Sequence, residues 1–172
     1  MFIQSESIYL RALEGTDLDF LYELENDRQI WPVSDTRTPF SRHVLQEYLQ
    51  RSSADIYEVR QLRFVICQHD HQPVGTVDLY DFDPAHLRAG VGLVLAPSFQ
   101  GRGYGFQALT CLEEYSAATL HLHQLFCSVA HDNEKSIRLF SKAGFRQVGV
   151  RKDWLRMSNG WKDVVELQKI LP

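Results

Sequence analysis

The chain has 172 residues, of which 44% are apolar and 23% charged, and its formal net charge is −4. This length and composition are typical of one globular unit, so we expect a single domain over residues 1–172. The mildly acidic charge argues against nucleic acid or an anionic membrane as the partner. No segment approaches the ~20 apolar residues of a membrane span, and the first residues do not resemble a secretory signal. We therefore predict a cytoplasmic protein.

Metal and disulfide chemistry is not indicated by the sequence. The chain has three cysteines, an odd number, and they form no CxxC pair. They are Cys67, Cys111 and Cys127. All three fall in apolar strand or helix patterns, which predicts buried, reduced thiols. Two pairs of alternately spaced histidines lack a third ligand, so we predict no metal site.

The first third of the chain predicts one strand and two helices. The expected elements are a strand over 7–13, a helix capped by Thr16 that ends near 26–27, a loop over 31–39, and a helix capped by Ser41 that ends near 52–53. Serine and threonine hydroxyls suit these caps because they can accept a hydrogen bond from the first helical turn. The inner side of the second helix is expected to carry Val44, Leu45, Tyr48 and Leu49.

The rest of the chain alternates between strands and helices. The expected strands are 62–68, 74–80, 88–95, 124–130, 145–151 and 164–170. One helix is expected from about 106 to 120, and another, capped by Asp132 or Asn133, through 142. Because a helix joins strand 88–95 to strand 124–130, these two strands should be parallel. Ser158, Asn159 and Gly160 predict the final turn. The order predicts an α/β sandwich with a mixed sheet.

A glycine-rich turn follows the central strand. After Ala96 and Pro97, which end the strand, the sequence runs Gln100, Gly101, Arg102, Gly103, Tyr104 and Gly105, and a helical pattern then begins. The free N–H groups and the dipole at a helix N-terminus favour an anion such as pyrophosphate, and glycines let the backbone approach it. A tight turn without a ligand is the alternative. The spacing matches neither a nucleotide triphosphatase loop nor a dinucleotide fingerprint.

This turn resembles a known cofactor loop. The pattern Q-x-x-G-x-G from Gln100 to Gly105 is similar to the coenzyme A loop of the GNAT superfamily of N-acyltransferases. A second segment, from Asn133 to Phe145, resembles the GNAT pattern N-x-x-[AS]-x-x-x-[YF]-x-x-x-G-F. The tail SNGWKDVVEL resembles the branch with spermidine and ribosomal-protein N-terminal acetyltransferases. The resemblance implies a three-layer sandwich with a mixed, mostly antiparallel sheet and a splayed parallel strand pair.

The resemblance also implies how acetyl-CoA is bound. Pantetheine would pair with the backbone of Leu93, Val94 and Leu95, and pyrophosphate would lie on the six residues of the glycine-rich turn. Asn133 would bond the pantetheine arm, while Ser136, Phe140 and Lys142 would line the rest of the groove. Simpler roles remain open: Asn133 as a helix cap, Phe140 as a core residue, and Lys142 as a solvated lysine.

The implied reaction is direct attack of an amine on the thioester, with the oxyanion held by a backbone N–H near Leu95 that a bulge in strand 88–95 frees. Two catalytic side chains common among relatives are missing, since Phe140 replaces a tyrosine and Gly90 a glutamate. Ser136 or water could assist the leaving thiolate.

Asp78 and Asp81 are the carboxylates nearest in sequence that could act as the base, and each could instead be a solvated strand-edge residue. A base matters because deprotonating a lysine-like amine at pH 7 costs about 4.6 kcal/mol.

The sequence hypothesis is therefore an acetyl-CoA-dependent N-acetyltransferase that acts on a polyamine-like amine or a protein N-terminal α-amine. Residues 31–40, with Trp31, Tyr80 and Asp81, would shape the acceptor side. The alternative is an acyl-CoA-binding sensor that has lost turnover, which the missing glutamate and tyrosine would favour. A larger acyl group and a homodimer also remain open.

Overall fold

The computed structural model describes residues 3–34, 36–52 and 54–172. Its elements in chain order are β1 (Ile3–Gln4), β2 (Ile8–Ala12), the 3-10 turn η1 (Gly15–Asp17), α1 (Leu18–Glu25), α2 (Trp31–Ser34), α3 (Arg42–Gln50), α4 (Ile56–Val59), β3 (Leu62–Gln68), β4 (Pro73–Asp83), β5 (Arg88–Leu95), the 3-10 turn η2 (Pro97–Phe99), α5 (Tyr104–Ala118), β6 (Gln124–Ala130), α6 (Glu134–Lys142), β7 (Arg146–Met157) and β8 (Gly160–Ile170).

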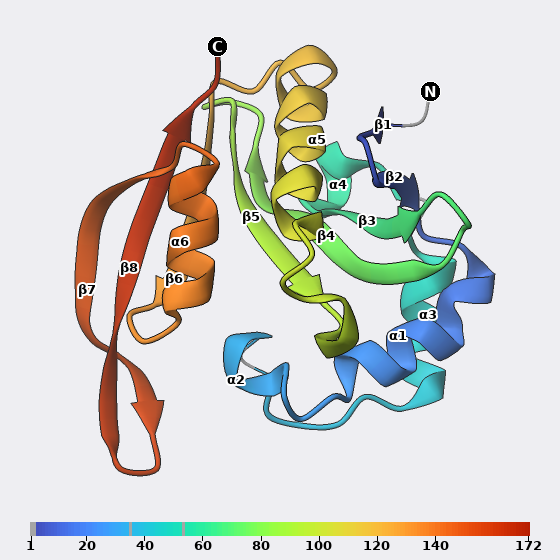
Figure 1. Cartoon of the computed structure of the whole chain (residues 1–172), viewed down its shortest axis with the longest axis horizontal. Helices are drawn as coiled ribbons and strands as arrows, with labels where there is room; N and C mark the ends of the chain where they lie inside the picture. The colour runs from blue at the N-terminus through green and yellow to red at the C-terminus, as the bar shows by residue number, and fades with distance from the viewer. Residues whose placement is uncertain (1–2, 35, 53) are drawn as a thin grey trace.

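One mixed sheet organises the molecule. Its strand order is β1-β2-β3-β4-β5-β6-β8-β7, and β5 and β6 are a parallel pair among antiparallel neighbours. Within the described ranges, the pairing of β5 with β6 extends from Arg88 and Gln124 to Gly90 and Phe126. Beyond this point the two strands run apart (Figure 1). The predicted α/β sandwich with a splayed parallel pair is confirmed.

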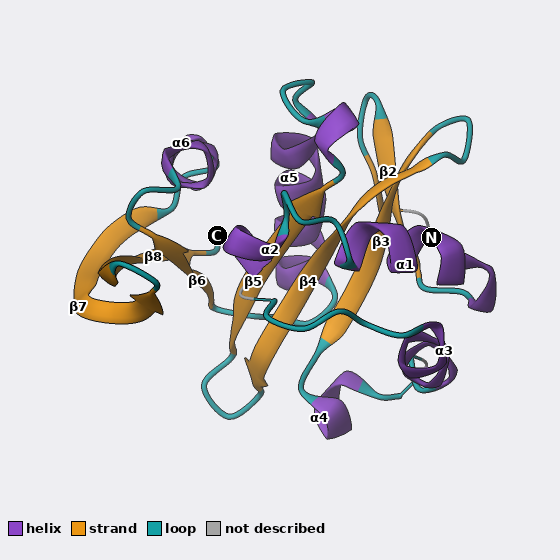
Figure 2. Cartoon of the chain, turned by 90° about the horizontal axis from the view of Figure 1, so that it is seen from below, coloured by secondary structure: helices purple, strands orange, loops and turns teal. Residues whose placement is uncertain are grey.

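The divergence gives the sheet two walls. We call β4 and β5 the first wall, and β6 and β8 the second wall; the vertex is the point where Gly90 pairs with Phe126. Helices α5 and α6 cover one face of the sheet, and α1 and α3 lie towards its other face beside β2 and β3 (Figure 2).

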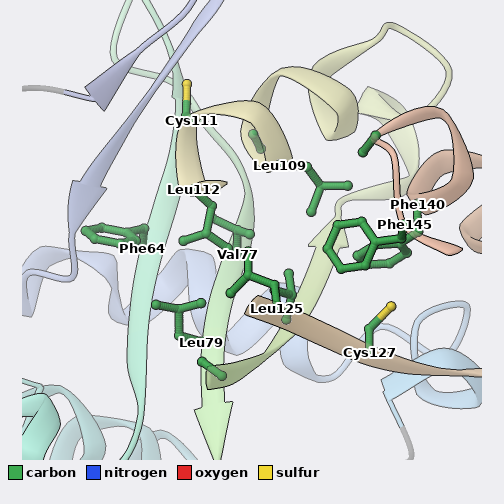
Figure 3. Close-up of a cluster of buried hydrophobic side chains, with 14 of the residues drawn as sticks. Phe64, Val77, Leu79, Leu109, Cys111, Leu112, Leu125, Cys127, Phe140 and Phe145 are labelled. Atoms are coloured by element: carbon green, nitrogen blue, oxygen red, sulfur yellow. The ribbon is translucent and has the colours of Figure 1, made fainter. Parts of the chain in front are cut away.

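The main core lies between the sheet and α5. Alternate residues of the strands enter it, because successive side chains of a strand point to opposite faces. From the second wall, Leu125 and Cys127 point into this cluster beside the ring of Phe145 (Figure 3). The residues between them in sequence, such as Phe126, therefore face the opposite side of the sheet.

A bulge interrupts β4 next to the vertex. Tyr80 pairs with Gly90 and Asp83 with Arg88, so β4 carries one extra residue there, and Asp81 adopts a positive φ of 48°. The extra residue reverses the alternation, which brings Phe82 into the core although Tyr80 points to the other face. The bulge expected in strand 88–95 near Leu95 is therefore wrong: β5 pairs regularly with β4 from Gly90 to Leu95.

Several predicted boundaries in the first third need correction. Thr16 is not a cap but part of η1, where the carboxylate of Asp17 accepts from the Glu14 N–H (2.8 Å) and pairs with Arg11 (2.7 Å). The predicted loop over 31–39 begins with the helix α2. The short helix α4 was also not anticipated. Local side-chain contacts, which periodicity does not register, decide these turns.

The second predicted helix is confirmed at its start. The Ser41 hydroxyl accepts from Val44 N (3.2 Å), as expected of an N-cap. The helix ends at Gln50, and the expected end residue Ser53 lies outside the described residues. Val44 is 47% exposed rather than on the inner side, where Leu45 and Leu49 are buried.

Strands 62–68, 88–95 and 124–130 have the predicted bounds. The final hairpin is longer than predicted, since β7 extends to Met157 and β8 begins at Gly160, while the turn lies where Asn159 and Gly160 indicated it. No helix in the described ranges is long and apolar enough to cross a membrane.

Candidate active site

The carboxyl end of β5 leads through η2 into α5. Gly101 and Gly103 adopt positive φ values of 77° and 83°, a conformation that glycine enters without steric cost. The Gln100 amide donates to the Leu95 carbonyl oxygen (3.1 Å), so this side chain braces the turn. Helix α5 starts at Tyr104, and the N–H groups of its first turn have no acceptor within the helix.

The glycines of this turn differ in their surroundings. A Cβ added at Gly101 or Gly103 would meet nothing within 4 Å, so both backbones border open space. A Cβ at Gly105 would lie 3.1 Å from Leu139 Cδ2 and 3.5 Å from Leu93 Cδ2, so this glycine lets α5, α6 and β5 pack closely. Gly105 thus has a packing role that the sequence did not reveal.

The Tyr104 side chain does not reach towards the turn. It is buried, and the Gln68 amide of β3 donates to its hydroxyl (2.8 Å). Only the backbone N–H of Tyr104 therefore remains as a candidate contact for an anion.

Two cations flank the start of α5. The Arg102 guanidinium carbon lies 5.3 Å from the Phe99 ring centroid, and the Lys142 ammonium lies 4.7 Å from the Phe106 ring centroid. Lys142 is at the end of α6, yet its charge is held beside the first turn of α5. Both charges add to the positive end of the helix dipole, so this corner of the molecule favours a phosphate group.

The open edge of β5 exposes only part of its backbone. Ala96 N donates to Val74 O (2.9 Å), which turns the Ala96 amide towards β4. Because successive residues of a strand direct their amides to alternate edges, Leu95 and Leu93 direct theirs towards β6, and Val94 directs its own towards β4. The amides of Leu93 and Leu95 are thus the ones available to a ligand beyond the vertex, whereas that of Val94 is taken up by the sheet.

Helix α6 lies above the second wall. Asn133 caps it by accepting from Ser136 N (3.2 Å), as expected. Phe140 is 5% exposed, and its ring meets Phe145 edge to face with centroids 5.1 Å apart (Figure 3). Phe140 is therefore a core residue, in agreement with its helical spacing, and its ring does not line a groove.

Tyr80 occupies the vertex. A Cβ at Gly90 would lie 2.3 Å from Tyr80 Cε2, so the tyrosine ring fills the space that a side chain at position 90 would need. The same ring meets Phe126 of the second wall edge to face, with centroids 5.9 Å apart. Burial raises the pKa of Tyr80 to about 12, although the nearby Ser128 backbone N–H lowers it in part. At neutral pH Tyr80 is thus a hydrogen-bond donor.

The two predicted carboxylates have different surroundings. Asp78 receives two bonds from Arg63, Nε to Oδ1 at 2.7 Å and Nη2 to Oδ2 at 2.9 Å, and Arg63 also donates to Glu25 (2.7 Å). A carboxylate with both oxygens held by a guanidinium is poorly placed to accept a proton. Asp81 is exposed on the bulge and lines a cavity of about 390 Å³ that also includes Arg60.

Trp31 lies on α2, and its indole N–H donates to the Glu25 carbonyl oxygen (2.9 Å). Both overall views place α2 between the carboxyl ends of β5 and β6 (Figures 1 and 2). The expected acceptor segment 31–40 therefore approaches the space between the walls, although its residue Asp35 lies outside the described residues.

Sequence reasoning missed four polar residues on this side of the sheet. They are Glu25, Arg63, Ser128 and Glu166. Ser128 Oγ donates to Glu166 Oε2 (3.0 Å) across β6 and β8. No motif marks these residues, and only their alternation with buried neighbours could have indicated one shared face.

The thiols are poor nucleophiles. All three cysteines are buried and unpaired, as predicted. Burial raises the pKa of Cys127 to about 12 and that of Cys111 to about 11, which keeps both protonated. In the described parts of the chain no three His, Cys, Asp or Glu residues gather as a metal site requires.

Comparison with known proteins agrees with this geometry. Residues 7–146 match the family described as Acetyltransferase (GNAT) domain. The spermidine N(1)-acetyltransferase of Vibrio cholerae is 28% identical over 160 residues, covering 93% of this chain and 91% of the relative. The [ribosomal protein uS5]-alanine N-acetyltransferase of Escherichia coli is 32% identical, but over 44% of this chain and 39% of the relative.

Solved structures agree as well. A Vibrio cholerae spermidine N-acetyltransferase in complex with CoA and spermine has a TM-score of 0.87 at 27% identity, with 95% of each chain covered. A dodecameric structure of this enzyme has a TM-score of 0.80. These relatives are enzymes, which supports the enzyme hypothesis over the sensor alternative. With the family match over most of the chain and the diverging β5 and β6, the protein belongs to the GNAT acetyltransferase family and is an N-acetyltransferase.

Proposed function

We propose that the protein transfers the acetyl group of acetyl-CoA to a primary amine of a polyamine-like acceptor. One observation carries this proposal: the pairing of β5 with β6 stops at Gly90 and Phe126, which leaves the amides of Leu93 and Leu95 beside a helix N-terminus. Pantetheine would pair with these amides, and pyrophosphate would lie on the N–H groups of the turn from Gln100 to Gly105.

The phosphate groups would be held mainly by backbone and by two charges. The N–H groups at Gly101, Gly103 and Tyr104 suit an oxyanion, and Arg102 and Lys142 would add positive charge. Phosphate specificity would therefore depend on the turn conformation more than on any one side chain.

The reaction would be direct attack of the amine nitrogen on the thioester carbon. The N–H of Leu95 would stabilise the oxyanion, and this requires no bulge in β5 because Leu95 already directs its amide away from β4. The thiol of CoA would leave as thiolate at modest cost, since a thiol has a pKa of about 8.5. Asn133 and Ser136, at the start of α6, would contact the pantetheine arm near the thioester. Cys127 takes no part.

Support for a polyamine comes from the spermidine acetyltransferases, which match nearly the whole chain. The acidic net charge also suits a polycation. A protein N-terminal α-amine has weaker support, because the ribosomal-protein relative matches less than half of this chain. Trp31, Tyr80 and Asp81 would shape the acceptor side.

Self-association is part of the proposal. A solved relative is dodecameric, and the terminal hairpin exposes large apolar side chains that another copy could cover. They include Val148, Trp154 and Trp161. Light scattering after size exclusion should therefore show a mass above one protomer.

A thiol-release assay tests the proposed function. Acetyl-CoA is supplied with spermidine, with peptides bearing a free α-amine, or with a neutral polyol as control. We expect free thiol and acetylspermidine with spermidine and only background release with the polyol. Preference for the peptides would overturn the polyamine assignment. Binding of CoA without thiol release from any amine would overturn the proposed function as a whole.

A further inference from the structure

A third carboxylate, besides Asp78 and Asp81, lies on the second wall. Glu166 of β8 lies directly opposite Ser128 of β6, and Ser128 Oγ donates to its Oε2 (3.0 Å). Both residues alternate with core residues, since Cys127 and Leu167 belong to the buried cluster. Glu166 therefore lies on the face of the sheet opposite α6, the face that Tyr80 and Phe126 share.

Glu166 has spare hydrogen-bonding capacity. Its Oε1 is buried, and among the described residues no donor makes a hydrogen bond to it. Arg151 Nε lies 3.1 Å from this oxygen, close enough for an ion pair but out of line for a hydrogen bond. A buried oxygen without a donor is unusual, because such an oxygen costs free energy unless a partner fills the place. The 47%-exposed Arg151 side chain lies against this oxygen, so an ammonium ion that displaces the guanidinium would supply the donor that the oxygen lacks.

The other two carboxylates are less suited. Both oxygens of Asp78 already accept from Arg63, and Asp81 is exposed on the bulge, at the end where β5 and β6 are still paired. Glu166 instead lies on the diverging side of the vertex, because Ser128 follows Phe126 by two residues along β6. Its side chain is only 18% exposed, which strengthens its interaction with a cation.

Tyr80 completes the arrangement. Its ring fills the place above Gly90, so no carboxylate could be carried at position 90 without displacing it. Its ring meets Phe126 of β6, and Ser128, the partner of Glu166, follows Phe126 by two residues on the same strand face. The phenol of Tyr80 thus lies on the face of the sheet that carries Glu166.

We propose that Glu166 is the catalytic carboxylate that binds the acceptor ammonium and takes its proton, with Tyr80 orienting the amine; this rests on the proposed acetyl transfer. One proton passes from the ammonium to Glu166 Oε1, which leaves a free lone pair on nitrogen. That lone pair forms the C–N bond while the C–S bond breaks, and the thiolate takes the second proton from nitrogen. Glu166 then returns its proton to solvent, so the products are the acetamide, the thiol of CoA and one proton.

The test compares Glu166→Gln with wild type on two acceptors. One is spermidine, whose amines have a pKa near 10, and the other is glycinamide, whose amine has a pKa near 8 and is partly neutral at pH 7.5. We expect kcat/KM for spermidine to fall by about 100-fold or more, and that for glycinamide by less than about tenfold, because the second amine needs less help to lose its proton. Glu166→Asp should recover part of the loss.

A matched control lies on the same strand. Asp163 of β8 is 25% exposed and pairs with Lys152 of β7 (2.7 Å). Glu166 pairs in a similar way with Arg151 of β7. Asp163 is three residues from Glu166 on the strand, so its side chain points to the opposite face of the sheet. Asp163→Asn should therefore leave kcat/KM for both acceptors within about threefold of wild type. CoA affinity and urea unfolding of each variant show whether the fold is retained.

Each outcome decides one hypothesis. Equal losses for both acceptors, or full activity in folded Glu166→Gln, would overturn the role of Glu166 and leave the proposed function intact. If wild-type protein releases no thiol with any of the amines tested, both the proposed function and this role of Glu166 are overturned.

Discussion

Asp78 of β4 and Glu166 of β8 are the carboxylates of the two walls, and they differ in how their oxygens are bonded. The first wall satisfies its carboxylate completely, because Arg63 bonds both oxygens of Asp78 and also reaches Glu25. The second wall leaves Glu166 Oε1 without a hydrogen-bond donor. The comparison shows that a carboxylate must be judged by its partners, since Asp78 is fully bonded within the fold, whereas Glu166 retains an oxygen that accepts no hydrogen bond among the described residues.

The largest expected effect is a loss of stability when the charge of Asp78 is removed, which distinguishes a structural carboxylate from a catalytic one. Asp78→Asn removes the charge that neutralises the largely buried Arg63, and we expect the free energy of unfolding to fall by about 3 kcal/mol. Urea denaturation measures this loss, and Glu166→Gln should cost clearly less stability. A stable Asp78→Asn protein without turnover would instead assign the proton transfer to Asp78.

The next effect concerns the vertex where the walls meet. Gly90→Ala places a methyl group 2.3 Å from the Tyr80 ring, and we expect a loss of about 2 kcal/mol in unfolding free energy. Gly92→Ala is the control on the same face, because its Cβ would make an ordinary 3.7 Å contact with Asp78. Tyr80→Ala should relieve the clash, so a double-mutant cycle should show coupling between positions 80 and 90. Equal losses at Gly90 and Gly92 would contradict the packing described here.

A pH experiment sharpens the description of Tyr80. Its pKa is raised to about 12 in the folded protein from an ordinary value of about 10, so the folded state favours the protonated phenol. The associated stability is fully present below about pH 10 and is lost as pH rises through 12, which amounts to about 1.4 kcal/mol by pH 11.

Tyr80→Phe should lack this part of the alkaline loss. Urea melts of both proteins from pH 9 to 11 measure the difference, and the buried thiols, which titrate in both proteins, cancel in the comparison. Parallel pH profiles would show that Tyr80 is not buried as described.

The smallest expected effect is on KM for acetyl-CoA and concerns Lys142, at the end of α6. Lys142→Met removes the ammonium held beside Phe106 and the start of α5, and we expect KM for acetyl-CoA to rise about threefold, less so at high salt. KM for the amine should not change. Arg138→Met, on an exposed face of the same helix, provides the control. A Lys142 effect that is insensitive to salt would argue against a phosphate contact.

Much of the fold was predictable because its signals are local. Three strands of the sheet have the predicted bounds, and the parallel pair followed from the helix between them. The caps by Ser41 and Asn133 also followed, since a cap depends on residues only three positions away. The missed features are the bulge in β4 and the short helices α2 and α4, which depend on contacts that no period describes.

The candidate site also has some features that the sequence predicts and others that only the structure shows. By itself the sequence determined the glycine turn, the order of the longer strands and helices, and hence the family, because these are properties of consecutive residues. Only the tertiary structure showed that Tyr80 fills the place above Gly90, that Arg63 saturates Asp78, and that Glu166 retains an oxygen without a donor. The physical reason is that hydrogen-bond saturation depends on which side chains meet across neighbouring strands, and strand register is fixed only when the sheet assembles.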